Sequence, residues 1–246
     1  MKNLILILSI IILLSCQKQK TENKMFGIFK SKKELTRKET TEKILKEKGI
    51  KINFNLPNVE TEDETELRKP KEIAIRVTIL AITNTVAFNG MTGKEAIAYL
   101  KKYNLWNETT PDEKKFLENP TEEKKIEESW KCEGIWTLMW SLKIVNNLDF
   151  PNEMCDLNKI PANKYPISQK VDPNIFINSI KEIRSKTEIL DQTDFYYRAN
   201  WACVDARLNG LEMEKINPGI VYERQYALNW LINYMEQEWD DISCDT

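Results

Sequence analysis

The chain has 246 residues, of which 41% are hydrophobic, 30% are charged and none is histidine. This length and apolar content suffice for one domain with a core of ordinary size, and the composition is not that of a disordered or fibrous protein. The lack of histidine excludes Ser-His-Asp and Cys-His catalytic pairs, histidine-ligated metal sites and imidazole acid–base catalysis.

The first residues have the pattern of an export signal. Lys2 precedes an apolar run from Leu4 to Leu14, which is too short to span a membrane as a helix but suits the apolar part of a signal peptide. The run ends in Leu13-Leu14-Ser15-Cys16, which resembles the lipobox of bacterial lipoproteins, where signal peptidase II cleaves before the cysteine.

We therefore expect residues 1–15 to be removed and Cys16 to carry the lipid, which would place the protein in the bacterial cell envelope as a membrane-anchored lipoprotein. One alternative is an uncleaved hydrophobic start or a plain signal peptide. Another is translation from Met25, which would give a cytoplasmic protein.

Residues 16–33 are predicted to form a flexible basic stem. Between Gln17 and Lys51, twelve Lys or Arg stand against five Asp or Glu, whereas residues 52–246 carry 23 basic and 33 acidic side chains. A basic stem beside a lipid anchor favours contact with anionic headgroups, at ~1 kcal/mol per Lys near the surface. The alternative is a solvated linker. The acidic body argues against nucleic acid as a partner.

The apolar periodicity predicts one all-α, multi-helix domain over residues 34–246, with at most one short extended segment near residues 50–56. Helices are expected near residues 34–48, 72–88, 92–103, from 110, 121–145, 172–184, 188–209 and 218–238. The segment 72–88 is apolar on almost every face, which predicts a central position. Residues 146–171 contain three prolines and are expected to form a long irregular connection.

Two of these helix starts carry the pattern of a capping box. Thr92 is followed three residues later by Glu95, and Thr110 by Pro111 and Glu113. In such a box the Thr hydroxyl and the Glu carboxylate each accept a hydrogen bond from a backbone N–H of the first turn. These motifs predict helix starts and no function.

Four cysteines follow Cys16, and no two of them have the C-x-x-C spacing of a zinc knuckle or thioredoxin-like centre. They are Cys132, Cys155, Cys203 and Cys244. Cys132 and Cys203 lie in helical patterns, where a small buried thiol is common. We therefore expect free thiols, although three disulfide connectivities would be open to an exported protein.

Three carboxylates recur at a spacing of three residues, at Glu188, Asp191 and Asp194. On one continuous helix, Glu188 and Asp191 would share a face and could hold Mg²⁺ together, as in a metal-dependent hydrolase of unknown substrate. The interpretation that we favour is that Asp191 or Asp194 caps a helix that restarts at Asp194-Phe195.

Other charges fall on faces that are otherwise apolar. Such charges must pair with one another or face a cavity, so they indicate either a structural ion-pair network or a ligand site. The candidate cluster comprises Glu133, Asp194, Arg198, Trp201, Asp205, Arg224, Trp239, Asp240 and Asp241.

The end of the chain is expected to fold back onto the domain. An exposed Trp239 would be costly, and Arg198 and Arg224 need anionic partners. We predict that Trp239 fills a gap between the last two helices and that Asp240 or Asp241 pairs with one of these arginines. Glu133, Asp194, Trp201 and Asp205 are expected to line the same region.

Several motifs together resemble those of a bacterial family catalogued as domain of unknown function 4272. They are Glu128-Ser129-Trp130-x-x-Glu133, Glu188-Ile189-Leu190-Asp191, Tyr197-Arg198-x-x-Trp201-Ala202, Glu223-Arg224-x-x-Ala227-Leu228-Asn229-Trp230 and Trp239-Asp240-Asp241-x-x-x-Asp245-Thr246. The resemblance extends over most of residues 35–246 and implies no established activity. Members of the family often have an aromatic residue or His where this chain has Asn200, so any imidazole chemistry of relatives would be absent here.

From these observations we expect a lipid-anchored, non-catalytic binding or interaction domain without a cofactor. Its partner, besides the membrane reached through the anchor, is a protein or small molecule that the sequence does not identify. The alternative is the carboxylate-metal hydrolase based on Glu188 and Asp191.

Overall fold

The computed structural model describes residues 35–168 and 171–246. The predicted signal peptide, Cys16, Met25 and the stem lie outside these residues. The described part of the chain contains α-helices and short 3₁₀ turns and no strand, which confirms the all-α prediction. Among the described residues, no helix has both the length and the apolar character needed to cross a membrane.

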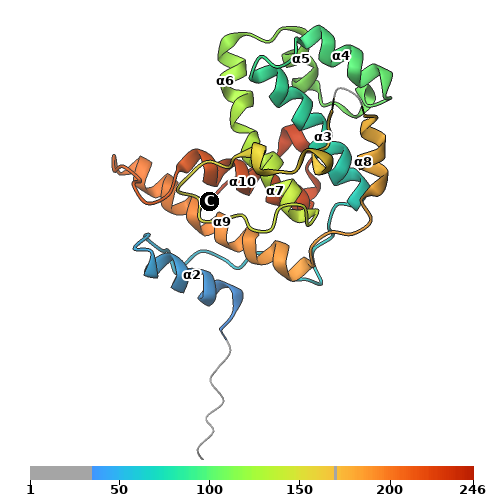
Figure 1. Cartoon of the computed structure of the whole chain (residues 1–246). Coiled ribbons are helices and arrows are strands. Elements are labelled where there is room, and N and C mark those ends of the chain that lie inside the picture. Colours follow the sequence, from blue (N-terminus) through green and yellow to red (C-terminus); the bar gives the residue numbers. More distant parts are fainter. Residues whose placement is uncertain (1–34, 169–170) are drawn as a thin grey trace, which may run out of the picture. The chain divides into compact units, whose positions relative to one another are not determined.

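The described helices are α2 (Arg37–Glu47), α3 (Pro70–Ala87), α4 (Gly93–Lys102), α5 (Pro111–Glu118), α6 (Glu122–Trp130), α7 (Cys132–Ser141), α8 (Pro173–Ser179), α9 (Lys186–Leu208) and α10 (Pro218–Leu231). Figure 1 shows α4, α5 and α6 together at one end, α9 and α2 at the other, and α3, α7 and α10 between them. The helix α10 packs against both α9 and α7, and α2 packs against α9.

The helix α3 is central because it serves two apolar clusters. Ile73, Val77 and Leu80 belong to the larger cluster, which is built mainly from α7, α9 and α10. Ile79 and Ile82 face a smaller cluster with residues of α4, α5 and α8. This two-sided burial confirms the position that the apolar character of the segment predicts.

Both predicted capping boxes are present. The Thr92 and Thr110 hydroxyls accept hydrogen bonds from the backbone N–H groups of Glu95 and Glu113, whose carboxylates accept from the Thr backbone N–H groups in return. The helices α4 and α5 approach closely at Gly93, where a Cβ atom would lie 2.0 Å from the carbonyl oxygen of Leu117. Only glycine permits this contact.

Four local predictions need correction. Residues 50–56 form a loop with a turn near Asn53 rather than a strand. The expected helix 121–145 is divided at Lys131 into α6 and α7. The helix α9 runs without a restart through Asp191 and Asp194, because Ser185 and Glu188 form the capping box that begins it. The last helix ends at Leu231, since Asn233 is left-handed with a φ of 54°.

All four cysteines in the described part of the chain are free, as expected.

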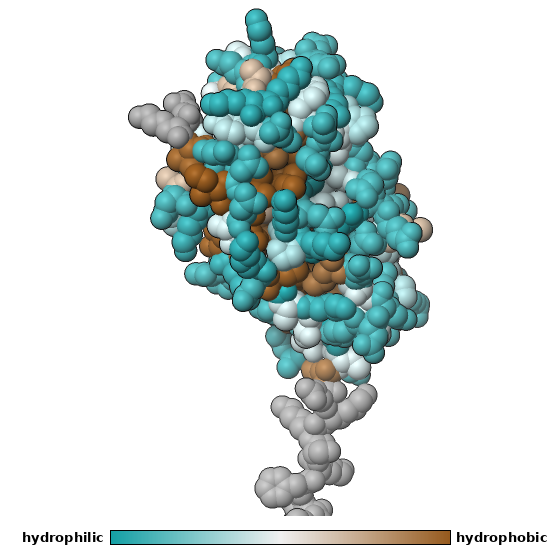
Figure 2. Space-filling view, turned by 90° about the vertical axis from the view of Figure 1, so that its right-hand side faces the viewer, coloured by the Kyte–Doolittle hydropathy of each residue, from teal (hydrophilic) through white to brown (hydrophobic). Residues whose placement is uncertain are grey.

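Apolar side chains also remain at the surface. On the face that carries α8, brown side chains gather in Figure 2, and Val171 and Ile175 are about half exposed or more, at 47% and 64%.

Candidate functional site

Glu133 and Arg224 form a buried ion pair that joins α7 to α10. The Glu133 Oε2 atom lies 2.7 Å from Arg224 Nε, and the two side chains are 0% and 2% exposed. Glu133 Oε1 accepts a hydrogen bond from the backbone N–H of Cys155 at 2.6 Å. Arg224 Nη1 donates to the Tyr196 hydroxyl at 2.8 Å and to the Leu148 carbonyl oxygen. Both charges are well satisfied, as a structural cross-link requires.

Asp194 and Arg198 form a second buried pair, one turn apart on α9. Arg198 Nη2 lies 2.8 Å from Asp194 Oδ1, and the side chains are 2% and 1% exposed. Arg198 Nη2 also donates to the carbonyl oxygen of Pro57 at 2.9 Å. This pair therefore ties α9 to the loop that follows α2.

Trp201 and Asp205 lie farther along α9 and interact with Lys51. The Lys51 Nζ atom lies 2.7 Å from Asp205 Oδ2 and 5.6 Å from the centre of the Trp201 ring. The predicted single cluster is therefore wrong in its geometry. The structure brings together Glu133 with Arg224 and Asp194 with Arg198, and it places Trp201 and Asp205 in a third, more exposed group.

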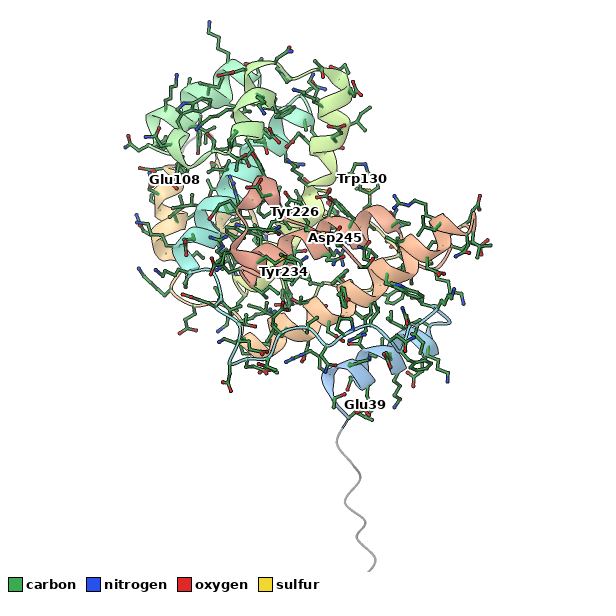
Figure 3. All side chains as sticks on the ribbon, turned by 180° about the vertical axis from the view of Figure 1, so that it is seen from behind. Glu39, Glu108, Trp130, Tyr226, Tyr234 and Asp245 are labelled. Carbon is green, nitrogen blue, oxygen red and sulfur yellow. The ribbon has the colours of Figure 1, made fainter. Side chains whose placement is uncertain are left out.

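Trp239 is buried, with 3% of its surface exposed, which confirms that the end of the chain folds back. It does not fill a gap between the last two helices. Its ring makes edge contacts with Tyr226 and Trp230 of α10, at centroid distances of 5.2 and 5.4 Å, and the Arg76 guanidinium of α3 lies 5.4 Å from its centre. Figure 3 shows Tyr226, Tyr234 and Asp245 near α10 from behind.

The predicted pairing of Asp240 or Asp241 with Arg198 or Arg224 is wrong. Both arginines already have a buried carboxylate partner, so neither needs the end of the chain. Asp240 instead accepts a hydrogen bond from the backbone N–H of Asp112 at 3.0 Å, in the first turn of α5, where helical N–H groups lack partners within the helix. Asp241 is exposed.

A further group of charges, which sequence reasoning missed, surrounds Lys131 where α5, α6 and α10 meet. We call Lys131, Glu113, Glu128 and Glu223 the Lys131 cluster. Lys131 Nζ lies 2.6 Å from Glu128 Oε1. Burial alone would lower the pKa of Lys131, but its attraction to Glu128, Glu113 and Glu223 raises it. Glu113 also pairs with Arg76 at 2.8 Å.

The carboxylates of the Lys131 cluster are less well satisfied than that of Glu133. Glu113 Oε1 and Glu128 Oε2 are buried without a hydrogen-bond partner among the described residues. Burial raises the pKa of Glu223 to about 7, since the repulsion from Glu128 and Glu133 adds to the effect and the attraction of Lys131 only partly opposes it. A carboxyl group with such a pKa changes charge near neutral pH, which is typical of functional sites.

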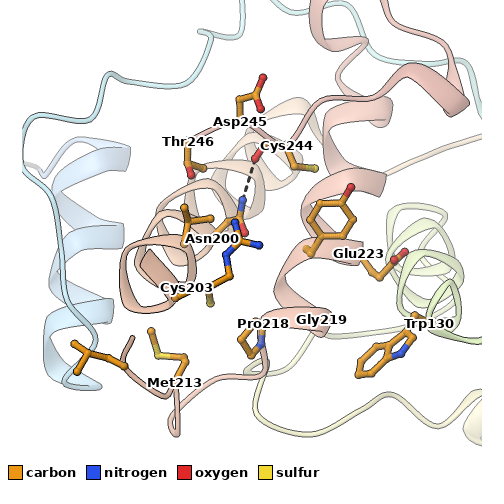
Figure 4. Close-up of a pocket in the computed structure, with 14 residues that line it drawn as sticks. Trp130, Asn200, Cys203, Met213, Pro218, Gly219, Glu223, Cys244, Asp245 and Thr246 are labelled. Carbon is orange, nitrogen blue, oxygen red and sulfur yellow. Dashed lines mark hydrogen bonds between the residues drawn. The ribbon is translucent and has the colours of Figure 1, made fainter. Parts of the chain in front are cut away.

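Glu223 also lies in the wall of a cavity of about 600 Å³ between α9, α10 and the last residues of the chain, which we call the C-terminal pocket. Figure 4 shows Trp130 and Glu223 on one side and Asn200 and Cys203 on the other. The side chain of Asn200 donates a hydrogen bond to the Cys244 carbonyl oxygen at 3.0 Å. The walls are mainly apolar, and the aromatic rings of Trp130 and Tyr222 contribute to them.

A glycine shapes this wall. A Cβ atom on Gly219 would lie 2.7 Å from the Trp130 ring, so the ring rests directly on the first turn of α10. Glu223 lies one turn further along the same helix. The pocket therefore presents one carboxyl group of raised pKa beside two aromatic rings.

The candidate metal pair Glu188 and Asp191 lies on the exposed side of α9. Glu188 belongs to the Ser185 capping box, and its other oxygen lies 2.8 Å from Arg184 Nη1. Asp191 lies 2.7 Å from Arg37 Nε. Each carboxylate therefore has an arginine partner, and a metal at this pair stays a prediction.

Within residues 35–168 and 171–246, one group of three side chains has ligand atoms close enough to bind one metal ion. It consists of Cys132, Glu133 and Cys155, whose ligand atoms all lie within 4.8 Å of one another.

The sequence contained a partial signal for the missed residues. Glu128 and Glu223 stand in the same motifs as Glu133 and Arg224. Lys131 follows Glu128 by three residues, a spacing that predicts an ion pair on a helix but not its meeting with α5 and α10. The two motifs meet in the folded domain around Lys131.

Comparison with known proteins gives a family and no described activity. No curated protein and no solved structure matches the chain. A family model described as Domain of unknown function (DUF4272) matches residues 37–242, which span α2 to the buried Trp239 segment. The chain therefore belongs to this family.

Proposed function

We propose that the protein is a non-catalytic binding module of an envelope lipoprotein and that the C-terminal pocket is its ligand site. The observation that carries this proposal is the position of Glu223, a half-buried carboxyl group in an apolar pocket beside the rings of Trp130 and Tyr222. Concave, mainly apolar cavities with a few polar groups are the usual form of small-molecule sites.

The chemistry of the walls favours a small organic cation with an apolar body. An aromatic ring attracts a cation to its face, and a carboxylate in a desolvated position gains more from a cationic partner than one in water. The Lys131 cluster supports this choice, because Lys131 pairs with Glu128 and Arg76 pairs with Glu113, which leaves Glu223 without an ion pair within the described residues. Arg207 and Asp245 are exposed lining residues and offset each other in charge.

Benzyltrimethylammonium is a suitable probe, with benzyl alcohol as its neutral counterpart. We expect the cation to bind the full-length protein, purified in mild detergent, and to quench tryptophan fluorescence, and we expect benzyl alcohol to bind at least tenfold more weakly. Affinity for the cation should be higher at pH 8 than at pH 6, because Glu223 is mainly ionised only above its pKa of about 7.

Glu223→Gln should weaken binding of the cation by about tenfold, or about 1.4 kcal/mol. Glu238→Gln is the matched control, since the Glu238 side chain is 74% exposed and lies outside the pocket. Equal affinity of the wild-type protein and Glu223→Gln for the cation would contradict the proposal.

The hydrolase alternative predicts a different result. Calorimetric titration with Mg²⁺, Mn²⁺ and Ca²⁺ should show no site that depends on Glu188 or Asp191, since both carboxylates are engaged by arginines. Tight binding that is lost in Glu188→Ala and Asp191→Ala would favour the hydrolase over the binding module.

The lipid anchor is proposed from the sequence Leu13-Leu14-Ser15-Cys16. Lipoprotein acyl chains bind the bilayer at ~0.8 kcal/mol per buried CH₂, so more than one chain gives stable attachment. Expressed from Met1 in a bacterium, the protein should fractionate with membranes, and Cys16→Ser should accumulate as an unlipidated precursor. Native protein that begins at Met25 in the soluble fraction would contradict this proposal.

A further inference from the structure

Two free cysteines and one buried glutamate meet at the first turn of α7, and none of the three lines the C-terminal pocket. Cys132 and Glu133 are the first residues of α7, and Cys155 belongs to the irregular connection 146–171. The Cys155 backbone N–H donates to Glu133 Oε1, and its Sγ atom lies 3.4 Å from the Cys132 carbonyl oxygen. These contacts fix the connection against α7 and bring the ligand atoms of all three side chains within 4.8 Å of one another.

We propose that Cys132, Glu133 and Cys155 bind one Zn²⁺ ion. Thiolates select zinc and other soft metals over Mg²⁺ and Ca²⁺, and a carboxylate oxygen is a regular third ligand. With zinc–ligand bonds of about 2.0–2.3 Å, the ligand atoms of a tetrahedral site lie roughly 3.3–3.8 Å apart. The observed group meets this spacing after side-chain movements of about 1 Å.

The surroundings of Glu133 suit a metal ligand. Its two oxygens each accept one hydrogen bond, from Cys155 N–H and from Arg224 Nε, and an ionised carboxylate has further lone pairs free. Outer hydrogen bonds of this kind orient a ligand toward the ion. With two thiolates, the Glu133 carboxylate, the Arg224 guanidinium and Zn²⁺, the charges sum to zero, so zinc would leave no net charge in this buried position.

The site opens onto a cavity of about 870 Å³, which we call the cysteine pocket. Cys132, Cys155 and Tyr165 line it, and it shares no lining residue with the C-terminal pocket. Three protein ligands beside an accessible cavity leave the fourth zinc position for water or an added ligand, whereas purely structural zinc sites have four protein ligands.

Cobalt substitution tests this proposal, because Co²⁺ bound by thiolates absorbs in the near ultraviolet and zinc does not. The full-length protein, purified in mild detergent and kept reduced, is titrated with Co²⁺ and then with Zn²⁺. We expect the absorption to saturate at one equivalent of Co²⁺ and to disappear when Zn²⁺ displaces the cobalt. The melting temperature of the zinc-bound protein should be higher than that of the metal-free protein. An absorption that does not saturate at one equivalent, or its absence, would overturn the proposal.

Cysteine variants show whether the metal lies at this place. Cys155→Ala and Cys132→Ala should each weaken Co²⁺ binding at least tenfold, whereas Cys203→Ala and Cys244→Ala should bind as the wild type does. Cys155 is half-buried in a connection, so Cys155→Ala is the decisive variant, and circular dichroism checks that it is folded. Undiminished binding in folded Cys155→Ala, or loss in Cys203→Ala or Cys244→Ala, would refute the site.

Discussion

The α4–α5 end of the domain and its α7–α9–α10 end are stabilised in different ways. At the first end, Leu100, Phe116 and Leu117 pack in an apolar cluster, and local capping boxes begin both helices. At the second end, the apolar cluster encloses the Glu133–Arg224 and Asp194–Arg198 ion pairs. The C-terminal pocket and the cysteine pocket also lie outside the α4–α5 pair.

This difference shows where the domain tolerates unfavourable groups. Burying a charge is costly unless it is paired and hydrogen-bonded, so a fold built for stability alone would avoid it. The α4–α5 end relies mainly on caps and apolar contacts, and its buried Glu113 carboxylate is paired with Arg76 of α3. The α7–α9–α10 end has two buried ion pairs, the Glu223 carboxyl of raised pKa and the two cysteines close to Glu133.

The largest effect should come from breaking the Glu133–Arg224 pair. Arg224→Met leaves a fully buried carboxylate without its partner, and we expect the free energy of unfolding to fall by about 3–5 kcal/mol. Urea denaturation measures this. Arg37→Met is the control, because Arg37 pairs with Glu62 and Asp191, whose side chains are 44% and 54% exposed, and its loss should cost about 1 kcal/mol or less.

A double variant distinguishes the destabilisation caused by the lost ion pair from the destabilisation caused by lost side-chain packing. The double variant Glu133→Gln/Arg224→Met should be less destabilised than the sum of the single variants, because no buried charge remains unpaired. If Arg224→Met and Arg37→Met lowered the free energy of unfolding by similar amounts, burial would not determine how much an ion pair contributes to the stability of this domain.

Trp239→Ala should have a somewhat smaller effect, about 3 kcal/mol, through loss of the contacts with Tyr226 and Trp230. The loss of stability falls at the lower end of the range for a large buried aromatic residue, because the indole N–H has no hydrogen-bond partner among the described residues. Removal of residues 239–246 should lower the free energy of unfolding by at least as much as Trp239→Ala does. Met235→Ala, at a side chain 71% exposed, is the control, and an unchanged melting temperature after the truncation would contradict the packing of this segment.

The two ends also differ in how far they could be predicted from the sequence. Thr92 and Thr110 could be recognised as helix starts because a capping box is a local pattern. Burial of Trp239 could be predicted because an indole ring is costly to expose. The partner of Arg224 could not, since Glu133 lies 91 residues away and several carboxylates compete for the same arginine.

Other features of the domain depend more on tertiary packing than on local patterns. The break at Lys131 interrupts a helical periodicity that continues through it, so the sequence predicts one helix where the structure has two. The Lys131 cluster and the approach of Cys155 to Glu133 each depend on segments that meet only after tertiary packing.

Glu223→Gln should reveal a cost of the Lys131 cluster that depends on pH. The folded protein raises the pKa of Glu223 from 4.5 to about 7, so it binds more protons than the unfolded chain between these values and loses stability as the pH rises through them. Glutamine imitates the protonated form. We therefore expect Glu223→Gln to be more stable than wild type at pH 8, by at most about 3 kcal/mol, and nearly equal at pH 4.5.

Thermal unfolding from pH 4.5 to 8 measures this difference. Glu188→Gln is an informative control, because hydrogen bonds from Ser185 and its pairing with Arg184 lower the pKa of Glu188. Its ionised form stabilises the fold, so Glu188→Gln should lose stability at neutral pH, and the difference from wild type should shrink as the pH falls. A stability difference for Glu223→Gln that is constant with pH would refute the titration of Glu223 in this range.

The smallest effects are expected at the caps of the α4–α5 end. Thr92→Ala and Thr110→Ala should each lower the free energy of unfolding by about 1 kcal/mol, because each removes the hydroxyl that accepts a first-turn N–H. Thr121→Ala, at the start of α6, should cost less, since its cap hydrogen bond is longer, at 3.4 Å, and Lys124 stands where a capping box needs Glu or Gln. The Thr92 box is exposed to water, which replaces the lost acceptor, whereas the Thr110 box is partly buried. Thr110→Ala should therefore cost the more of the two, and both should remain well below Arg224→Met in the same urea denaturation series. A Thr92→Ala cost equal to that of Arg224→Met would mean that the apolar contacts of the α4–α5 end depend on its caps, and that both ends rely equally on a few polar contacts.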